Sequence, residues 1–270
     1  MAKKKNVRYF SGQNEHETEL FRLLSTLEGR YRIGDVFRDF LHYSALRISN
    51  LCEGVHLQER QEQMKELLQK YEKTPILEEC FQSLTKAIVC NQQRGILRDV
   101  LGTIFEAIGL SNEVTGQFFT PEHVCRLMTK MTTGDKIPEL EKKPYITVSD
   151  PCIGSGRMLL AFANEMQDQG YNYCTQMVGM AVDIDSTCVY MSYIQFSLYG
   201  IPAVVIHGNS LLVQEWSRWY TPAYILCGWV FVQPISMIDR ISEDDKMLRK
   251  EIVEALFEMQ AESNVYAEMS

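Results

Sequence analysis

Apolar residues recur at helical spacing through the first third of the chain, in sets separated by polar stretches. Three sets stand out: Leu20, Leu23, Leu24 and Leu27; Phe37, Phe40, Leu41, Ala45 and Ile48; Leu77, Cys80, Phe81, Leu84 and Ile88. Residues three and four apart share one face of a helix, so each set predicts an amphipathic helix. The charged stretch 57–73 carries a thinner apolar stripe and predicts a helix with a solvated face. We interpret residues 1–97 as a helical N-terminal domain.

The pattern changes at Asp99, where short apolar runs begin to alternate with helical segments. Helices are predicted at 99–110, at 157–169 and at 186–199, and a further helix follows the loop that begins at Ser111. Strands are predicted at 145–148, in the run that ends at Asp183 and in the run that begins at Ala203, and the apolar run 223–232 is interpreted as a fourth. Alternating strands and helices indicate an open, mostly parallel α/β sheet over residues 98–235.

Two further segments, around Thr120 and after residue 235, have more specific signals. Thr120 is expected to cap the helix that follows the loop, with Pro121 at its first position and Glu122 as a favourable charge in its first turn. Residues 236–270 predict one acidic amphipathic helix, with Leu248, Ile252, Leu256 and Met259 on one side.

Composition places the chain among ordinary globular proteins, with 46% hydrophobic and 23% charged residues. No apolar run approaches the roughly 20 residues of a membrane span, and the basic N-terminus lacks the apolar core of a secretory signal. The eight scattered cysteines form no C-x-x-C pair, which favours free thiols in a reducing cytoplasm over a metal site. The net charge of −8 argues against strong, sequence-independent binding of nucleic acid by this chain alone, although residues 236–270 account for −5 of it.

The stretch "YITVSDPCIGSGRMLLAF" (145–162) predicts a strand, a glycine turn and a helix, which is a ligand site by geometry. A P-loop is excluded because no Gly-Lys pair follows, and a dinucleotide site lacks its third glycine after Gly154 and Gly156. S-adenosylmethionine fits better. Asp150 can accept from its ammonium group, and Asp183, at the end of the next strand, can accept from its ribose hydroxyls. Asn209, after the third strand, can meet its adenine.

Each of these features has a simpler interpretation when it stands alone. A glycine turn after a strand is often only a tight turn, and an acid at a strand end is often a helix cap. The aromatic-anchored segment "FFTP" (118–121) is compatible with an ordinary helix cap. Their order on successive strands is what favours the cofactor.

The segments "DVLGTIFEAIGL", "GQFFTPEHVCRLM", "SDPCIGSGRMLLAF", "AVDID" and "HGNSL" resemble the N-6 adenine DNA methylase family, which includes the modification subunits of type I restriction systems. The resemblance covers about Asp99 to Leu212 and implies a Rossmann-like S-adenosylmethionine-dependent methyltransferase fold with a helical N-terminal domain. It also implies a set of cofactor-binding residues: Gln117, Phe118, Phe119, Thr120, Pro121, Glu122, Asp150, Gly154, Ser155, Gly156, Asp183 and Asn209.

The chain departs from this family at the catalytic motif. The family places Asn or Asp, two prolines and Tyr or Phe just beyond the fourth strand, whereas no two of the eight prolines here are adjacent. "QPIS" (233–236) follows the expected strand, so Gln233 and Pro234 are the candidate catalytic residues, although an ordinary loop explains them as well. "TPAY" (221–224) keeps a proline and a tyrosine but precedes that strand. Because the Gln233 amide carries one more torsion than an asparagine, we expect weak turnover with intact cofactor binding.

Two functions therefore remain open. The first is a cytoplasmic adenine-N6 DNA methyltransferase of a restriction-modification or mobile-element system, acting on DNA with a separate specificity or partner subunit. The second is a catalytically inactive cofactor-binding or assembly module that pairs with an active methylase. The sequence indicates no metal and no membrane partner, and it leaves the oligomeric state open.

Overall fold

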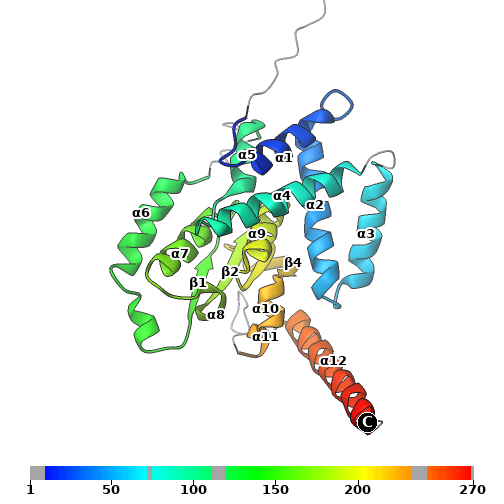
Figure 1. Cartoon of the computed structure of the whole chain (residues 1–270), viewed down its shortest axis with the longest axis vertical. Coiled ribbons are helices and arrows are strands. Elements are labelled where there is room, and N and C mark those ends of the chain that lie inside the picture. Colours follow the sequence, from blue (N-terminus) through cyan, green and yellow to red (C-terminus); the bar gives the residue numbers. More distant parts are fainter. Residues whose placement is uncertain (1–9, 72–74, 111–118, 233–241, 269–270) are drawn as a thin grey trace, which may run out of the picture.

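The computed structural model describes residues 10–71, 75–110, 119–232 and 242–268, with side chains up to Ala255. Four helices form the N-terminal third, as predicted (Figure 1). They are α1 (Glu15–Thr26), α2 (Ile33–Cys52), α3 (Leu57–Gln69) and α4 (Ile76–Gln93). The apolar sets named above supply the buried faces of these helices. Six of their residues are fully buried: Leu20, Leu24, Phe37, Phe40, Leu84 and Ile88.

A four-stranded sheet with flanking helices forms the rest of the described chain. Its strands are β1 (Ile146–Asp150), β2 (Met177–Asp183), β3 (Ala203–Asn209) and β4 (Gln214–Tyr220), which lie in that order. The β1–β2 and β2–β3 pairs are parallel, and β3–β4 is antiparallel. The helices are α5 (Val100–Ala107), α6 (Glu122–Thr133), α7 (Arg157–Asp168), α8 (Tyr173–Gln176), α9 (Ser186–Tyr199), α10 (Pro222–Leu226), α11 (Trp229–Val232) and α12 (Glu243–Glu268), with a short 3-10 turn at Pro138–Glu141.

Alternate residues of the central strands enter two different cores, because successive side chains of a strand point to opposite faces. On one face, Ala181 and Val205 join the large core that contains α7, α9 and the N-terminal helices. On the other, Val182 and Ile206 join a smaller core with α10, α11 and Leu248 of α12. The large core contains residues from both sides of the predicted boundary at residue 97, because α2 and α4 pack on α9. The domain boundaries 1–97, 98–235 and 236–270 stay predictions.

The predicted fourth strand is wrong. Residues 223–232 form α10 and α11, because Thr221 caps a helix whose first residue is Pro222, and its hydroxyl accepts from the Tyr224 N–H. The fourth strand is instead β4, whose sequence "QEWSRWY" does not look apolar. Its Arg218 is buried, and this charge is paired with Glu215 and Asp245.

The predicted cap of α6 is wrong by one residue. Pro121 occupies the cap position with no side-chain hydrogen bond, and the helix begins at Glu122, which is the predicted first-turn acid. The backbone carbonyl of Thr120 accepts from Arg157 Nη1 at 3.0 Å. The residue before a proline is driven to extended backbone, which explains why the helix cannot include Thr120.

The acidic helix α12 is confirmed, and its first turns are anchored to the body while its far end extends away from it (Figure 1). Asp245 accepts from the Tyr220 hydroxyl at 2.9 Å and from Arg218 Nη1 at 3.1 Å. Asp244 lies 3.3 Å from His56 Nε2, and Arg249 Nε donates to the Val230 carbonyl at 2.9 Å. Polar contacts made by its first two turns therefore hold α12 in place.

The His56–Asp244 contact makes stability depend on pH. The hydrogen bond to Asp244 raises the pKa of the His56 imidazole, which also faces Glu53 at 3.9 Å and the guanidinium of Arg60, and the same hydrogen bond lowers the pKa of Asp244. A group with a raised folded pKa stabilises the fold below its unfolded pKa and loses that contribution as pH rises through the folded value. We expect the free energy of unfolding to fall by about 0.5–1 kcal/mol from this source between pH 6 and pH 8.5, since both groups are partly exposed.

Urea unfolding at the two pH values measures this loss. His56→Gln should remove it, whereas His123→Gln, at an exposed position of α6, should leave it in place. An equal pH dependence in wild type and His56→Gln would contradict the assignment.

Candidate cofactor site

The loop after β1 has the predicted form of strand, glycine turn and helix. Asp150 ends β1, and its carboxylate accepts from the backbone N–H of Cys152 at 3.0 Å. The N–H of Ile153 donates to the carbonyl of Val182 at 2.9 Å, so the loop is hydrogen-bonded to the neighbouring strand β2. Residue 157 then begins α7. The N-terminus of this helix therefore points at the edge of the sheet where the parallel strands end.

Both loop glycines are required by close packing as well as by their backbone angles. Gly154 has φ 56° and Gly156 has φ 94°. A Cβ on Gly154 would lie 3.0 Å from the ring of Phe119, and one on Gly156 would lie 2.8 Å from the ring of Phe196. Left-handed backbone is costly for residues with a Cβ. A Cβ would also be in tight contact at Gly154 and would force a shift of neighbouring atoms at Gly156. The loop is thus packed against two aromatic rings.

Asp183 joins the first two loops of the sheet. One carboxylate oxygen accepts from the N–H of Gly154 and the other from the N–H of Asp185, both at 2.9 Å. Burial raises the pKa of the Asp183 carboxyl, while these N–H groups act in the opposite direction. A carboxylate has about four acceptor positions, so about two stay available for hydroxyl groups of a ligand.

A cavity of about 570 Å³ lies at this edge of the sheet, within the range of small-molecule sites. Six of the predicted cofactor-binding residues line it: Phe119, Thr120, Asp150, Gly154, Ser155 and Asp183. Residues 119–120, the loop after β1 and the end of β2 are far apart in the sequence, and the fold brings them to one place.

Other predicted residues lie elsewhere. Gly156, Pro121 and Glu122 are near this cavity in sequence but do not line it. The Asn209 side chain accepts from the N–H groups of Leu211 and Leu212, both at 3.0 Å, and so holds the turn between β3 and β4. Gln117, Phe118, Gln233 and Pro234 lie outside the described residues.

Sequence reasoning missed some lining residues. Met158, Ile184 and Cys188 contribute apolar surface to the cavity. Ile184 follows Asp183 directly and is 61% exposed, which is unusual for an isoleucine beside a buried strand. Its position directly after the strand-ending Asp183 could have identified it as a lining residue, because it follows Asp183 at the same edge of the sheet.

The Ser155 hydroxyl is used by the protein itself. It donates to the buried carboxylate of Asp99 at 2.6 Å, and the Ser155 carbonyl accepts from Gln195 Nε2 at 2.8 Å. Asp99 also caps α5 by accepting from the N–H of Gly102 at 2.8 Å. The "DVLG" segment at 99–102 therefore supports the loop from behind, a role that its sequence does not reveal.

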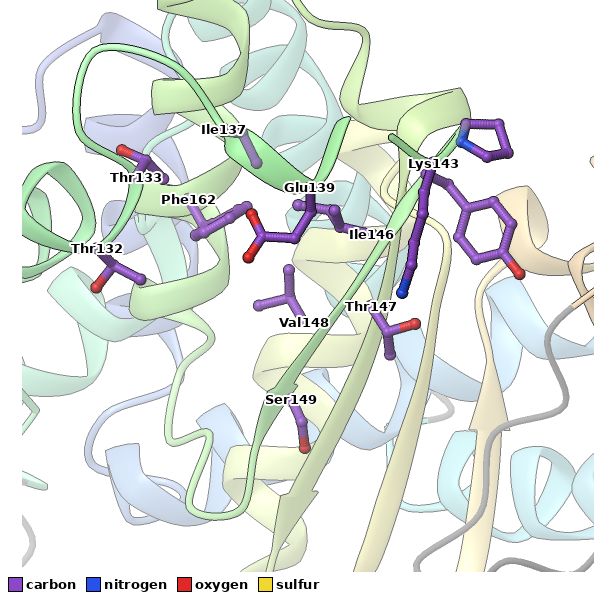
Figure 2. Close-up of a pocket in the computed structure, with 12 residues that line it drawn as sticks. Thr132, Thr133, Ile137, Glu139, Lys143, Ile146, Thr147, Val148, Ser149 and Phe162 are labelled. Atoms are coloured by element: carbon purple, nitrogen blue, oxygen red, sulfur yellow. The ribbon is translucent and has the colours of Figure 1, made fainter. Parts of the chain in front are cut away.

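A larger cavity of about 880 Å³ runs along β1 and does not include the glycine loop. Figure 2 shows the apolar side chains of Phe162, Ile146 and Val148 in its lining. One acidic and one basic side chain, Glu139 and Lys143, also line it. The smaller cavity carries the glycine loop and the two strand-ending acids, so it is the candidate ligand site. Within the described residues, no cluster of His, Cys, Asp or Glu could hold a metal ion.

Parallel strands, a glycine loop after the first and an acid ending the second define this chain as a protein of the Rossmann-like methyltransferase fold, with a helical N-terminal region. The sequence model of the N-6 DNA Methylase family matches residues 96–252, more than half of the chain. The chain belongs to that family.

Two solved structures are similar to it at low identity. One, a Listeria monocytogenes protein assigned to the class I S-adenosylmethionine-dependent methyltransferases, is 15% identical over 89% of this chain and 80% of its own, with a TM-score of 0.43. The other, the type I restriction-modification system methyltransferase subunit from Streptococcus thermophilus, is 14% identical over 69% of this chain and 57% of its own, with a TM-score of 0.29. Likeness at this level carries no inference about activity. The search of curated proteins found no match. Among the described helices, none is long and apolar enough to cross a bilayer.

The packing of Gly156 predicts a measurable cost for a single methyl group. Gly156 and Gly170 both have positive φ, 94° and 83°, but only a Cβ at 156 would meet other atoms within 4 Å. We expect Gly156→Ala to lower the free energy of unfolding by about 1–3 kcal/mol more than Gly170→Ala, the usual cost of overpacking. Urea denaturation of both variants measures the difference, and equal losses would show that the loop yields freely to the new methyl group.

Proposed function

We propose that this chain binds S-adenosylmethionine in the cavity at the glycine loop and serves as an adenine-N6 DNA methyltransferase of a restriction-modification or mobile-element system. The observation that carries the proposal is the placement of Asp150, Gly154 and Asp183 around one cavity at the ends of β1 and β2. Membership of the N-6 DNA Methylase family supports the same reaction class.

The residues present fit the cofactor. Asp150 has a carboxylate at the cavity that can accept from an ammonium group, and Asp183 keeps acceptor positions for two vicinal hydroxyls. The exposed side chain of Ile184 offers an apolar surface to a purine ring beside them. When bound, the cofactor supplies an electrophilic methyl group. The chain's own contribution at this site is to orient that group and to exclude water.

The acceptor side of the reaction depends on residues outside the described part of the chain. An exocyclic amine is a weak nucleophile and must be held in line with the methyl group, where a misplacement of about 1 Å can cost on the order of a hundredfold. Gln233 and Pro234 are our candidates for this task. The net charge of −8 favours DNA binding together with a separate specificity or partner subunit. We place the protein in the bacterial cytoplasm, where its eight free cysteines would stay reduced.

One observation favours a second function. The sequence has no Asn/Asp-Pro-Pro-Tyr/Phe tetrapeptide, so the chain can bind the cofactor without transferring its methyl group. It would then be an assembly module that pairs with an active methylase. Labelled cofactor and mixed duplex DNA, incubated with the purified chain alone and with cell extract, separate the two functions. Methyl transfer by the purified chain rejects the assembly module.

Cofactor binding has a direct calorimetric test. We expect Asp183→Ala to weaken binding of S-adenosylmethionine by about 1.5–3 kcal/mol, because a charged acceptor is lost. Asp183→Asn keeps an acceptor for the Gly154 N–H and should lose less. Asp168→Ala, at an exposed position at the end of α7, is the matched control and should bind as wild type does. No binding by wild type at millimolar cofactor, or unchanged binding by Asp183→Ala, would overturn the assignment.

The catalytic segment can be tested by rebuilding the family motif. The triple change Gln233→Asn, Ile235→Pro and Ser236→Phe creates it around the native Pro234. We expect weak or undetectable turnover in wild type and a gain in the triple variant, because the shorter amide removes one torsion. The dissociation constant for the cofactor should stay unchanged and serves as the control. Strong wild-type turnover that Gln233→Ala does not reduce would show that this segment is not involved.

A further inference from the structure

Phe119 and Thr120 reach the cofactor cavity from the segment before α6, and side chains of other elements hold them there. The Phe119 ring lies 5.1 Å from the ring of Phe105 in α5, and a Cβ on Gly154 would lie only 3.0 Å from it. The Thr120 carbonyl accepts a hydrogen bond from Arg157 Nη1. The position of this wall of the cavity is therefore set by α5 and by the start of α7.

Arg157 lines the cavity itself and also contacts both residues of this wall. It is the first residue of α7, 9% exposed, and its Nε donates to the buried carboxylate of Asp99 at 2.7 Å. Its Nη1 also donates to Glu106 at 3.3 Å, and its guanidinium lies 5.7 Å from the centre of the Phe119 ring. A planar guanidinium can make these contacts at the same time because its donors diverge in fixed directions.

The charges around Arg157 keep it in place. Burial opposes its charge, but Asp99 and Glu106 outweigh that effect and raise the pKa of the guanidinium. The Asp99 carboxylate is held in turn, since it accepts from Gly102, Ser155 and Gln195 as well. Gly102 allows this closeness, because a Cβ there would clash with the Asp99 carboxylate oxygen Oδ2. Arg157 is therefore held by two carboxylates, and it contacts both Phe119 and Thr120.

We propose that Arg157, oriented by Asp99, is a positioning residue that holds Phe119 and Thr120 as a wall of the cofactor cavity. Cofactor affinity then depends on Arg157 through the residues it holds. This inference rests on the proposed binding of S-adenosylmethionine. It gives the buried Arg157–Asp99 ion pair a role in cofactor affinity.

Arg157→Lys is the sharpest probe. A lysine keeps the positive charge beside Asp99, so the buried carboxylate is not left unpaired. Its single ammonium group cannot reach Asp99, the Thr120 carbonyl and the Phe119 ring together. We expect the dissociation constant for S-adenosylmethionine, measured by calorimetry, to rise about tenfold, the equivalent of one lost charged hydrogen bond. Arg126→Lys, the same change at an exposed position of α6, should stay within about twofold of wild type.

A double-mutant cycle with Phe119→Leu shows whether Arg157 acts through the ring. If it does, Arg157→Lys should change the dissociation constant by only about threefold or less in the Phe119→Leu background, because contacting residues give non-additive effects. Additive losses would mean that Arg157 contacts the ligand directly and would overturn the positioning role. Melting temperatures of the ligand-free variants separate this from a structural role, which would lower the melting temperature and leave the affinity of the folded protein unchanged.

Glu106→Ala is the second variant, in case Arg157→Lys does not fold. The Glu106 side chain is 41% exposed and contacts Arg157 from the outer side, so its loss leaves the buried core intact. We expect a rise of about threefold in the dissociation constant. If Arg157→Lys and Glu106→Ala both bind S-adenosylmethionine with wild-type affinity, the positioning role is overturned and the proposed function stands. Absence of binding by wild type overturns the proposed function and this inference with it.

Discussion

The carboxylate of Asp99 is the constraint on which the proposed cofactor site depends. It is 3% exposed, and burying a lone carboxylate costs several kcal/mol. Four donors offset that cost: the Gly102 N–H, the Ser155 hydroxyl, Gln195 Nε2 and Arg157 Nε. They come from α5, the glycine loop, α9 and α7. Because removing any one leaves part of a buried charge unsatisfied, the glycine loop and the three helices α5, α7 and α9 are held together at this carboxylate.

A second buried charge organises the opposite end of the sheet in the same way. Arg218 of β4 is paired with Glu215 and with Asp245 of α12, and its carbonyl accepts from Arg60 of α3 at 2.5 Å. Arg60 also lies 4.0 Å over the ring of Trp219. The chain thus uses paired charges to join its helical N-terminus and its acidic C-terminal helix to the sheet. The candidate ligand cavity lies away from these ion pairs, at the ends of β1 and β2.

Periodicity predicted most of the fold and failed where a charge was buried. The helices at 15–26, 33–52 and 76–93 and the strands β1, β2 and β3 have apolar residues at the spacing that their neighbours in the fold require. β4 was missed because Arg218, a charged residue, points into the core, where only its ion pairs make it tolerable. The run 223–232 was misassigned because apolar character alone does not separate strand from helix. The Thr221-Pro222 cap decides it locally.

By itself, the sequence determined the order of elements as far as β3, the glycine loop at 150–156 and the acid at 183, because each depends on residues adjacent along the chain. It also determined membership of the methylase family through short motifs. Only the tertiary structure decided that Phe119 packs on Gly154, that Ser155 donates to Asp99 and that Arg157 joins both. These partners are up to 58 residues apart. Local patterns report which face of an element is buried, whereas the partner that a buried polar group meets depends on how the elements pack.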